Sequence, residues 1–100
     1  MGTTVTNQVY LLTGGNLGNR KSYLHAATIA ITQQCGPVVA ASPIYETEAW
    51  GPAAAPYLNQ ALLIETTASA PLLLQIILDI EESLGRVRQE RYGPRTIDID

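Results

Sequence analysis

Two aspartates lie next to the C-terminal end of the sequence, in a segment whose other residues favour a β-strand. Asp98 and Asp100 alternate with Ile97 and Ile99, so we expect both carboxylates on one face of a strand, with α-carbons about 6.6 Å apart. Two such carboxylates can hold one or two divalent ions, and hard oxygen ligands without histidine or thiol favour magnesium or manganese over zinc. Taken alone, an Asp-x-Asp pair is more often just the polar side of a strand.

Most of the basic residues precede that pair directly. Guanidinium groups form forked hydrogen bonds with phosphate oxygens, and phosphoryl transfer depends on positioning and neutralising those oxygens. The cluster next to the aspartates therefore predicts a nucleotide-phosphate site, with a solvated basic loop as the alternative. Glu81 and Glu82, just before the cluster, can pair with its first members. The clustered residues are Arg86, Arg88, Arg91 and Arg95.

A third feature is aromatic. Tyr45, Trp50 and Tyr57 fall within a short stretch, and Asn59 shares a strand face with Tyr57. Aromatic rings supply stacking area, and an amide offers a donor and an acceptor side by side, which suits a flat heterocycle. Ordinary filling of the core by the tyrosines is the alternative interpretation.

The elements that must position these residues follow from periodicity and from turn residues. Strands are expected at 8–13, 38–45, 57–66 and 96–100. Asn16 or Asn19 caps a first helix that ends at Gly36, and a second helix runs from its cap at Ser69 to Gly85. The order βαββαβ indicates an α+β fold of the ferredoxin-like class, with an antiparallel sheet and two helices on one face. We expect the last strand to be cut short.

Composition limits the classes of protein. The chain has 100 residues, 46% of them hydrophobic and 15% charged, which predicts one globular domain over 1–100, incomplete at its C-terminal end. A formal net charge of -3 argues against a nucleic-acid partner. The apolar run 72–78 is too short to span a membrane, and the first residues lack a basic, apolar leader, so we expect a cytoplasmic protein. Cys35 is the single cysteine, which rules out an internal disulfide.

Three motifs in this order resemble the 6-hydroxymethyl-7,8-dihydropterin pyrophosphokinases of folate biosynthesis. They are Y-L-L-T-G-G-N-L-G-N-R near the start, S-P-I-Y-E-T-E-A-W-G followed by Y-L-N-Q-A, and G-R-V-R-Q-E-R-Y-G-P-R-T-I-D-I-D at the end. The resemblance covers essentially the whole chain. It implies a transferase that moves pyrophosphate from ATP to the hydroxymethyl group of a reduced pterin, with AMP as the second product.

The resemblance also implies roles for individual residues. Asp98 and Asp100 correspond to ligands of two Mg²⁺ ions, and Arg86 and Arg95 to catalytic arginines. The residues implied to bind the co-substrate ATP are Glu81, Arg86, Arg88, Arg91, Tyr92 and Arg95. Those implied to bind the pterin are Thr47, Trp50, Tyr57 and Asn59.

The end of the sequence raises an alternative to an active transferase. Family members continue past the second aspartate, so this chain is expected to hold a partial nucleotide site with weak or no turnover. The alternative is a catalytically inactive relative that acts as a ligand-binding or protein-interaction module. In either case the partners are expected to be small molecules, and an incomplete sheet edge can support self-association.

Overall fold

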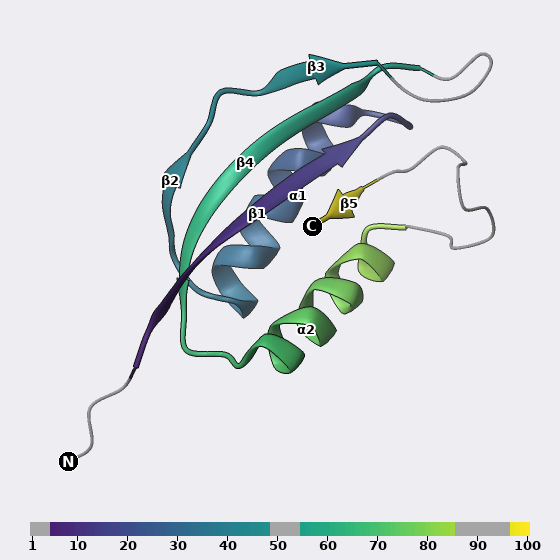
Figure 1. The fold of residues 1–100 in the computed structure, drawn as a ribbon. Helices are drawn as coiled ribbons and strands as arrows, with labels where there is room; N and C mark the ends of the chain where they lie inside the picture. Colours follow the sequence, from purple (N-terminus) through teal and green to yellow (C-terminus); the bar gives the residue numbers. More distant parts are fainter. Residues whose placement is uncertain (1–4, 49–54, 86–96) are drawn as a thin grey trace.

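We describe the protein from a computed structural model that covers residues 5–48, 55–85 and 97–100, with the backbone alone at position 98. Its strands form one antiparallel sheet in the order β2-β4-β1-β5, and β3 also pairs with β4 (Figure 1). The fold is α+β and is compatible with a ferredoxin-like arrangement. The elements are β1 (Asn7–Gly15), α1 (Arg20–Gln34), β2 (Val38–Ala41), β3 (Tyr45–Thr47), β4 (Tyr57–Thr66), α2 (Ala70–Ser83) and β5 (Asp98–Ile99).

Helix α1 begins where one of the two candidate caps predicts. The Oδ1 atom of Asn19 accepts a hydrogen bond from the backbone N–H of Ser22 at 3.2 Å, which satisfies a donor of the first turn. Asn16 is therefore not the cap. At the other end Gly36 has φ +149°, and a Cβ there would clash with the carbonyl oxygen of Glu65, so only glycine fits.

The strand expected over 38–45 is wrong as a single element. The structure has two short strands, β2 and β3, separated by Ser42, Pro43 and Ile44. Ser42 continues the pairing with β4, since its N–H donates to the carbonyl of Ala61 at 2.8 Å and its Oγ accepts from the N–H of Ala61 at 2.9 Å. Pro43 has no N–H to donate, which explains why the ladder stops there and resumes at Tyr45.

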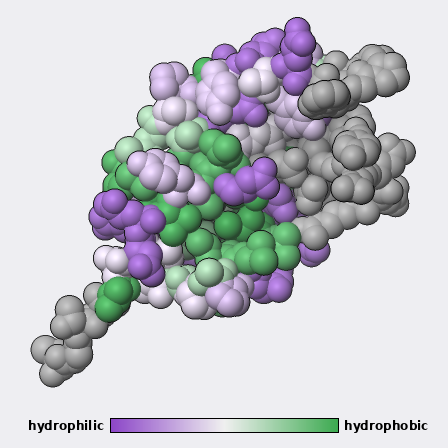
Figure 2. Space-filling model, viewed as in Figure 1, coloured by the Kyte–Doolittle hydropathy of each residue, from purple (hydrophilic) through white to green (hydrophobic). Residues whose placement is uncertain are grey.

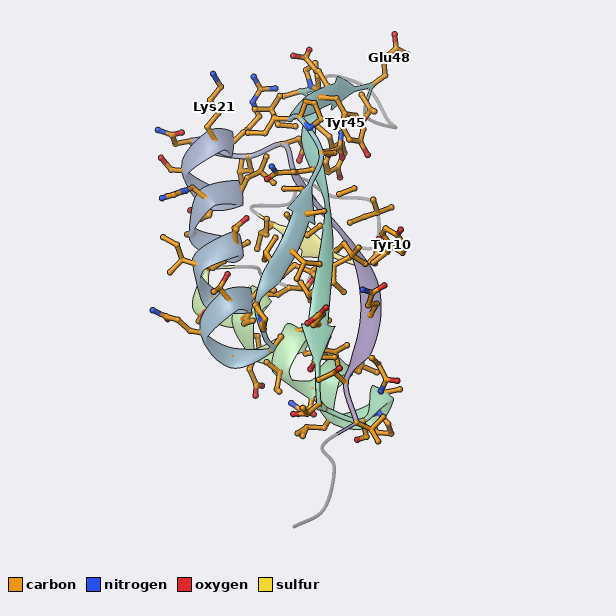
Figure 3. All side chains as sticks on the ribbon, turned by 90° about the vertical axis from the view of Figure 1, so that its left-hand side faces the viewer. Tyr10, Lys21, Tyr45 and Glu48 are labelled. Carbon is orange, nitrogen blue, oxygen red and sulfur yellow. The ribbon has the colours of Figure 1, made fainter. Side chains whose placement is uncertain are left out.

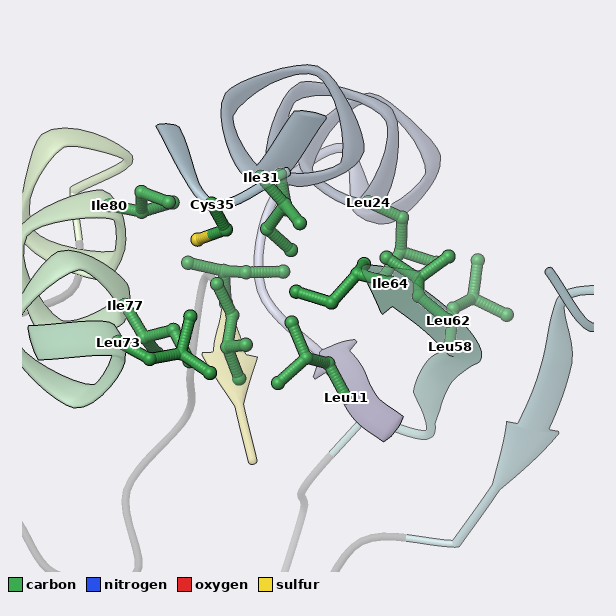
Figure 4. Close-up of a cluster of buried hydrophobic side chains, with 13 residues drawn as sticks. Leu11, Leu24, Ile31, Cys35, Leu58, Leu62, Ile64, Leu73, Ile77 and Ile80 are labelled. Atoms are coloured by element: carbon green, nitrogen blue, oxygen red, sulfur yellow. The ribbon is translucent and has the colours of Figure 1, made fainter. Parts of the chain in front are cut away.

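Strand β4 agrees with the prediction at both ends. Leu58, Leu62, Ile64 and Thr66 are buried, whereas the alternate positions are only partly covered. Together with buried apolar residues of β1, α1, α2 and the β5 segment, Leu58, Leu62 and Ile64 form one hydrophobic core (Figure 4). Successive residues of β4 thus face either the helices or the opposite side of the sheet.

Helix α2 was also predicted correctly. The Oγ atom of Ser69 accepts from the N–H of Leu72 at 3.4 Å, Pro71 lies in the first turn, and Gly85 follows the helix with φ +89°. Its side chains Leu73, Ile77 and Ile80 are buried against the sheet and α1. Neither helix in the described part of the chain is long and apolar enough to cross a membrane.

The last strand is shorter than the expected range 96–100, and residue 96 lies outside the described residues. Pairing with β1 nevertheless continues past Ile99, because Asp100 and Leu12 exchange both backbone hydrogen bonds, at 2.7 and 2.8 Å. Ile97 and Ile99 are buried, as the alternation predicts, and Asp100 is exposed. The segment is therefore fixed to the sheet through its backbone.

Candidate active site

The register of the sheet brings distant parts of the sequence into line at Gly14. This residue pairs with Asn59 of β4 on one side and with position 98 of β5 on the other. Adjacent strands lie about 4.8 Å apart, so Asn59 and position 98 are separated by roughly 10 Å across a residue that has no side chain. Two residues earlier in β1, Leu12 is flanked by Ala61 and Asp100.

A pocket of about 150 Å³ lies over this part of the sheet. It brings together three of the residues predicted from the sequence, namely Tyr57 and Asn59 as pterin-binding residues and Asp100 as a metal ligand. Tyr45, one of the three aromatic residues that suit a flat heterocycle, also lines the pocket. The residues that line the pocket are Leu12, Thr13, Gly14, Tyr45, Tyr57, Asn59 and Asp100.

The pocket opens on the side of the sheet that α1 does not cover. Figure 3 shows Tyr10 on β1 projecting away from α1, on which Lys21 is labelled. Positions 10, 12 and 14 alternate with the buried residues Leu11 and Thr13, so they belong to this open face. The face is accessible to a ligand, because Tyr10 is 76% exposed and Leu12 51% exposed.

The side chain of Asn59 is held in a defined orientation. Its Nδ2 donates to the Oγ1 of Thr47 at 2.9 Å and to the carbonyl of Tyr45 at 3.3 Å. These bonds occupy both amide protons and turn the carbonyl oxygen Oδ1 toward Gly14. A Cβ at position 14 would lie only 2.7 Å from that oxygen. Thr47 thus joins the site through Asn59.

Glu81 lies in a different environment from the pocket. Its side chain is only 3% exposed, and its Oε2 accepts a hydrogen bond from the N–H of Ile99 at 2.9 Å. The backbone N–H of Ile99 in β5 therefore donates to a side chain of α2 and not to a neighbouring strand. The implied contact of Glu81 with ATP stays a prediction. Its hydrogen bond to Ile99 connects α2 with the segment that carries the aspartates, in addition to their packing in the core.

Several expected site residues lie outside the described residues. They are Trp50, Arg86, Arg88, Arg91, Tyr92 and Arg95, together with the side chain of Asp98. Their roles in binding pterin, ATP or metal therefore remain predictions from the sequence.

Sequence reasoning missed three residues that line the pocket, namely Leu12, Thr13 and Gly14. No chemical property of these residues distinguishes them. The signal that would have found them is the antiparallel pairing of the first and third predicted strands, because aligning 8–13 with 57–66 places Gly14 opposite Asn59.

Residues 10–100 match the family model described as 7,8-dihydro-6-hydroxymethylpterin-pyrophosphokinase (HPPK). The chain belongs to the HPPK family. The pocket lies within the matched range, and its lining includes residues of all three motifs noted in the sequence.

Individual relatives of the HPPK family agree with this assignment. The chain is 39% identical over 98 residues to a 2-amino-4-hydroxy-6-hydroxymethyldihydropteridine pyrophosphokinase from Bacillus subtilis, covering 96% of this chain and 59% of the relative. It is 41% identical over 95 residues to a protein of the same name from Methylorubrum extorquens, covering 93% of this chain and 60% of the relative. The chain therefore spans about three fifths of the length of these relatives.

Proposed function

We propose that this chain contributes the pterin site and the metal-binding aspartates of an enzyme that transfers pyrophosphate from ATP to 6-hydroxymethyl-7,8-dihydropterin. Membership of the HPPK family supports the reaction. The observation that carries the proposal is the single pocket that holds Asn59, Tyr57 and Asp100, since the sequence motifs had assigned them separately to ring binding and to metal binding.

The pterin would bind against Tyr45 and Tyr57. Both tyrosines line the pocket, and their rings offer apolar area for a flat bicyclic ring. Asn59 would act mainly as an acceptor, because its Nδ2 already donates to Thr47 and to the backbone of Tyr45. An acceptor held in this way fits the amino and ring N–H groups of a pterin. Trp50 would add to the aromatic wall.

The residues present fit a magnesium site. Asp100 offers an exposed carboxylate at the pocket, and position 98 is tied by backbone pairing next to Gly14. Oxygen donors of this type suit Mg²⁺, which keeps several waters and accepts phosphate oxygens. Asp98 and Asp100 would hold two ions, which when bound neutralise the phosphates and bring the pterin hydroxyl to the nucleotide.

The remaining steps concern the nucleotide. The pterin hydroxyl oxygen would attack the β-phosphorus of ATP, the bond from that phosphorus to the oxygen bridging it to the α-phosphorus would break, and AMP would leave. The hydroxyl proton would pass to solvent. Arg86 and Arg95 would stabilise the charge on the transferred group, and Glu81, Arg88, Arg91 and Tyr92 would complete the ATP site. Glu81 would contribute through its bond to Ile99 as well.

The test combines binding and turnover. Calorimetry would measure binding of 6-hydroxymethylpterin and of a non-hydrolysable ATP analogue with Mg²⁺, and an AMP-release assay would measure transfer. We expect Asn59→Ala to weaken pterin binding about tenfold or more, which corresponds to about 1.4 kcal/mol. Asp100→Asn is expected to weaken the Mg²⁺-dependent binding of the nucleotide. Glu65→Gln, on the open face of β4 beyond the pocket lining, is the matched control.

Failure to bind either ligand at millimolar concentration would overturn the proposal for this chain. Binding of a ligand without AMP release, also in a chain extended past Asp100, would instead support the inactive, ligand-binding relative. The ferredoxin-like topology and the cytoplasmic location remain parts of this proposal. Self-association through the sheet edge is likewise a prediction, which sedimentation of the purified chain would test.

A further inference from the structure

The turn between β1 and α1 contacts the two residues that precede β4. Asn16 Nδ2 donates to the carbonyl oxygen of Ala55 at 2.9 Å, and Arg20 Nη1 donates to the carbonyl oxygen of Pro56 at 2.9 Å. Asn16 is only 7% exposed, whereas Arg20 is half-buried. Two side chains from one turn thus bind two consecutive carbonyls of a segment nearly 40 residues away.

This contact begins where the backbone ladder ends. The last pair between β1 and β4 is Gly15 with Leu58, so β1 offers no backbone partner to the residues before Tyr57. Pro56 lacks an N–H, so its carbonyl is the only backbone group with which it can form a hydrogen bond, and a proline also restricts the backbone of the residue in front of it. Asn16 and Arg20 supply the donors for both carbonyls.

The held segment leads directly into the pocket. Tyr57 follows Pro56 and lines the pocket together with Asn59 two residues further on. A rotation of the backbone at residues 55 and 56 would move the ring of Tyr57 relative to the amide of Asn59, and a displacement of about 1 Å is enough to impair a positioned site. The hydrogen bonds from Asn16 and Arg20 therefore help to fix the distance between the ring of Tyr57 and the amide of Asn59.

We propose that Asn16 and Arg20 are positioning residues for the pterin side of the site. They hold the start of β4 so that the wall formed by Tyr57 is in place before the ligand binds, which lowers the ordering cost of binding. The proposal rests on the proposed function for the identity of the ligand. Neither residue touches the pocket, so their effect on binding is indirect.

The test compares variants that differ in their ability to donate. Asn16→Asp keeps the size of the side chain and removes the Nδ2 donor, and Arg20→Ala removes the other donor. Arg20→Lys keeps a donor, and Lys21→Ala changes an exposed neighbour on the same helix. Fluorescence titration would give the affinity for 6-hydroxymethylpterin, and calorimetry the affinity for the ATP analogue with Mg²⁺.

We expect Asn16→Asp to weaken pterin binding about tenfold and Arg20→Ala about threefold, since the second bond is exposed to water. The affinity for the ATP analogue is expected to change less than twofold, and Arg20→Lys and Lys21→Ala to bind as the unmodified chain. Equal weakening of both ligands would indicate general loss of structure and would overturn the proposal. Unchanged pterin affinity in both donor variants would overturn it as well.

A second pair of variants and an NMR measurement cover the cases in which Asn16→Asp does not fold or the unmodified chain does not bind pterin. If Asn16→Asp fails to fold, the pair Arg20→Ala and Arg20→Lys carries the test, because Arg20 contributes a surface bond. If the unmodified chain binds no pterin, the proposed function fails and the positioning role is decided by NMR. Arg20→Ala should then shift the amide signals of Ala55 and Tyr57, and Lys21→Ala should not; equal spectra would contradict the contact.

Discussion

The two faces of the sheet use the same strands for different purposes. On the face that packs against the helices, alternate residues of β1 and β4 enter a core of buried leucine, isoleucine and alanine side chains and Cys35. On the open face, the intervening residues leave a pocket with aromatic and polar lining at the end near Gly14. Because successive side chains of a strand point to opposite faces, each residue of the open face is followed by a residue of the packed face. A substitution can therefore change one face without changing the other.

The polar groups that are buried show how the faces are connected. Thr13 donates from its Oγ1 to the carbonyl of Gln60 at 3.1 Å, and Glu81 accepts from the N–H of Ile99. Thr66 donates to the carbonyl of Cys35 at 2.7 Å. Each of these bonds fixes a backbone segment, so the helix-covered face determines the positions from which the open face builds its site.

Apolar side chains are exposed on both β1 and α2. Figure 2 shows hydrophobic side chains gathered in the middle of the view used in Figure 1. Tyr10 and Leu12 of β1 and Leu74 of α2 are more than half exposed. A shallow apolar hollow also lies between the start of β1 and α2, and it is distinct from the pocket around Asn59, because its lining includes Val9, Leu73 and Ile77. Residue alternation thus distinguishes the two faces of the sheet clearly, whereas the hydropathy of their residues differs less.

The largest expected effect is on stability, and it should differ between two neighbouring residues of β4. Leu62 is fully buried and Leu63 only half-buried on the opposite face. We expect Leu62→Ala to lower the free energy of unfolding by about 2–5 kcal/mol, because it removes buried methyl groups and leaves a cavity. Leu63→Ala should cost clearly less. Urea unfolding of both variants measures the difference, and equal losses would contradict the division into a packed and an open face.

The second prediction concerns the bond that crosses from α2 to β5. Glu81→Ala leaves the N–H of Ile99 without its acceptor in a buried place, and we expect a loss of about 1–3 kcal/mol in the free energy of unfolding. Glu81→Gln keeps a side-chain oxygen of similar reach and serves as the matched control. Hydrogen exchange provides the specific readout, since the Ile99 amide should lose protection in the alanine variant and retain most of it in the glutamine variant.

The third prediction tests the close approach of β1 to Asn59. In Gly14→Ala the new Cβ would lie 2.7 Å from Oδ1, so the amide of Asn59 must move away from its position beside Thr47. We expect pterin affinity to fall about tenfold, or about 1.4 kcal/mol, with a smaller effect on unfolding.

A double-mutant cycle gives the control for that change. If the clash with Asn59 is the cause, adding Gly14→Ala to Asn59→Ala should produce little further loss of pterin affinity. Additive losses would show instead that the methyl group blocks the pocket by itself.

Much of the fold follows from local signals in the sequence. The caps at Asn19 and Ser69, the stop at Gly36 and the alternation along 57–66 are governed by neighbours in sequence, and the structure has the elements they predict. The break at Pro43 was missed because strand propensity over 38–45 outweighed a single residue without an N–H. Long-range bonds such as Asn16 to Ala55 leave no local pattern.

Some of the residues that line the pocket could be selected from the sequence by their chemistry. Asn59, Tyr57 and Asp100 were expected as site residues, and the structure brings them to one pocket. Gly14 and Leu12 belong to the same pocket only because of strand register, which a single sequence does not specify. Glu81 was expected at the nucleotide, whereas in the structure its Oε2 accepts a hydrogen bond from the backbone of Ile99, a partner that depends on how α2 packs.

The smallest expected effect lies on the packed face and depends on pH. Burial raises the pKa of the Cys35 thiol above its usual value of 9.0, so the folded chain keeps the thiol protonated at a pH where the unfolded chain loses the proton. Between these two pKa values the unfolded state binds fewer protons, and the free energy of unfolding therefore falls as pH rises. Below the unfolded pKa the neutral thiol contributes its full packing stability.

Cys35→Ala removes this titration. We expect the stability advantage of the unmodified chain over Cys35→Ala to be constant near neutral pH and to shrink as the pH rises past 9.0, measured by urea unfolding of both proteins. Iodoacetamide should label Cys35 slowly in the folded chain and rapidly in urea, because this residue is only 8% exposed. A constant difference between the two proteins across this range, or rapid labelling of the folded chain, would show that the thiol reaches water and that the packed face opens beside α1.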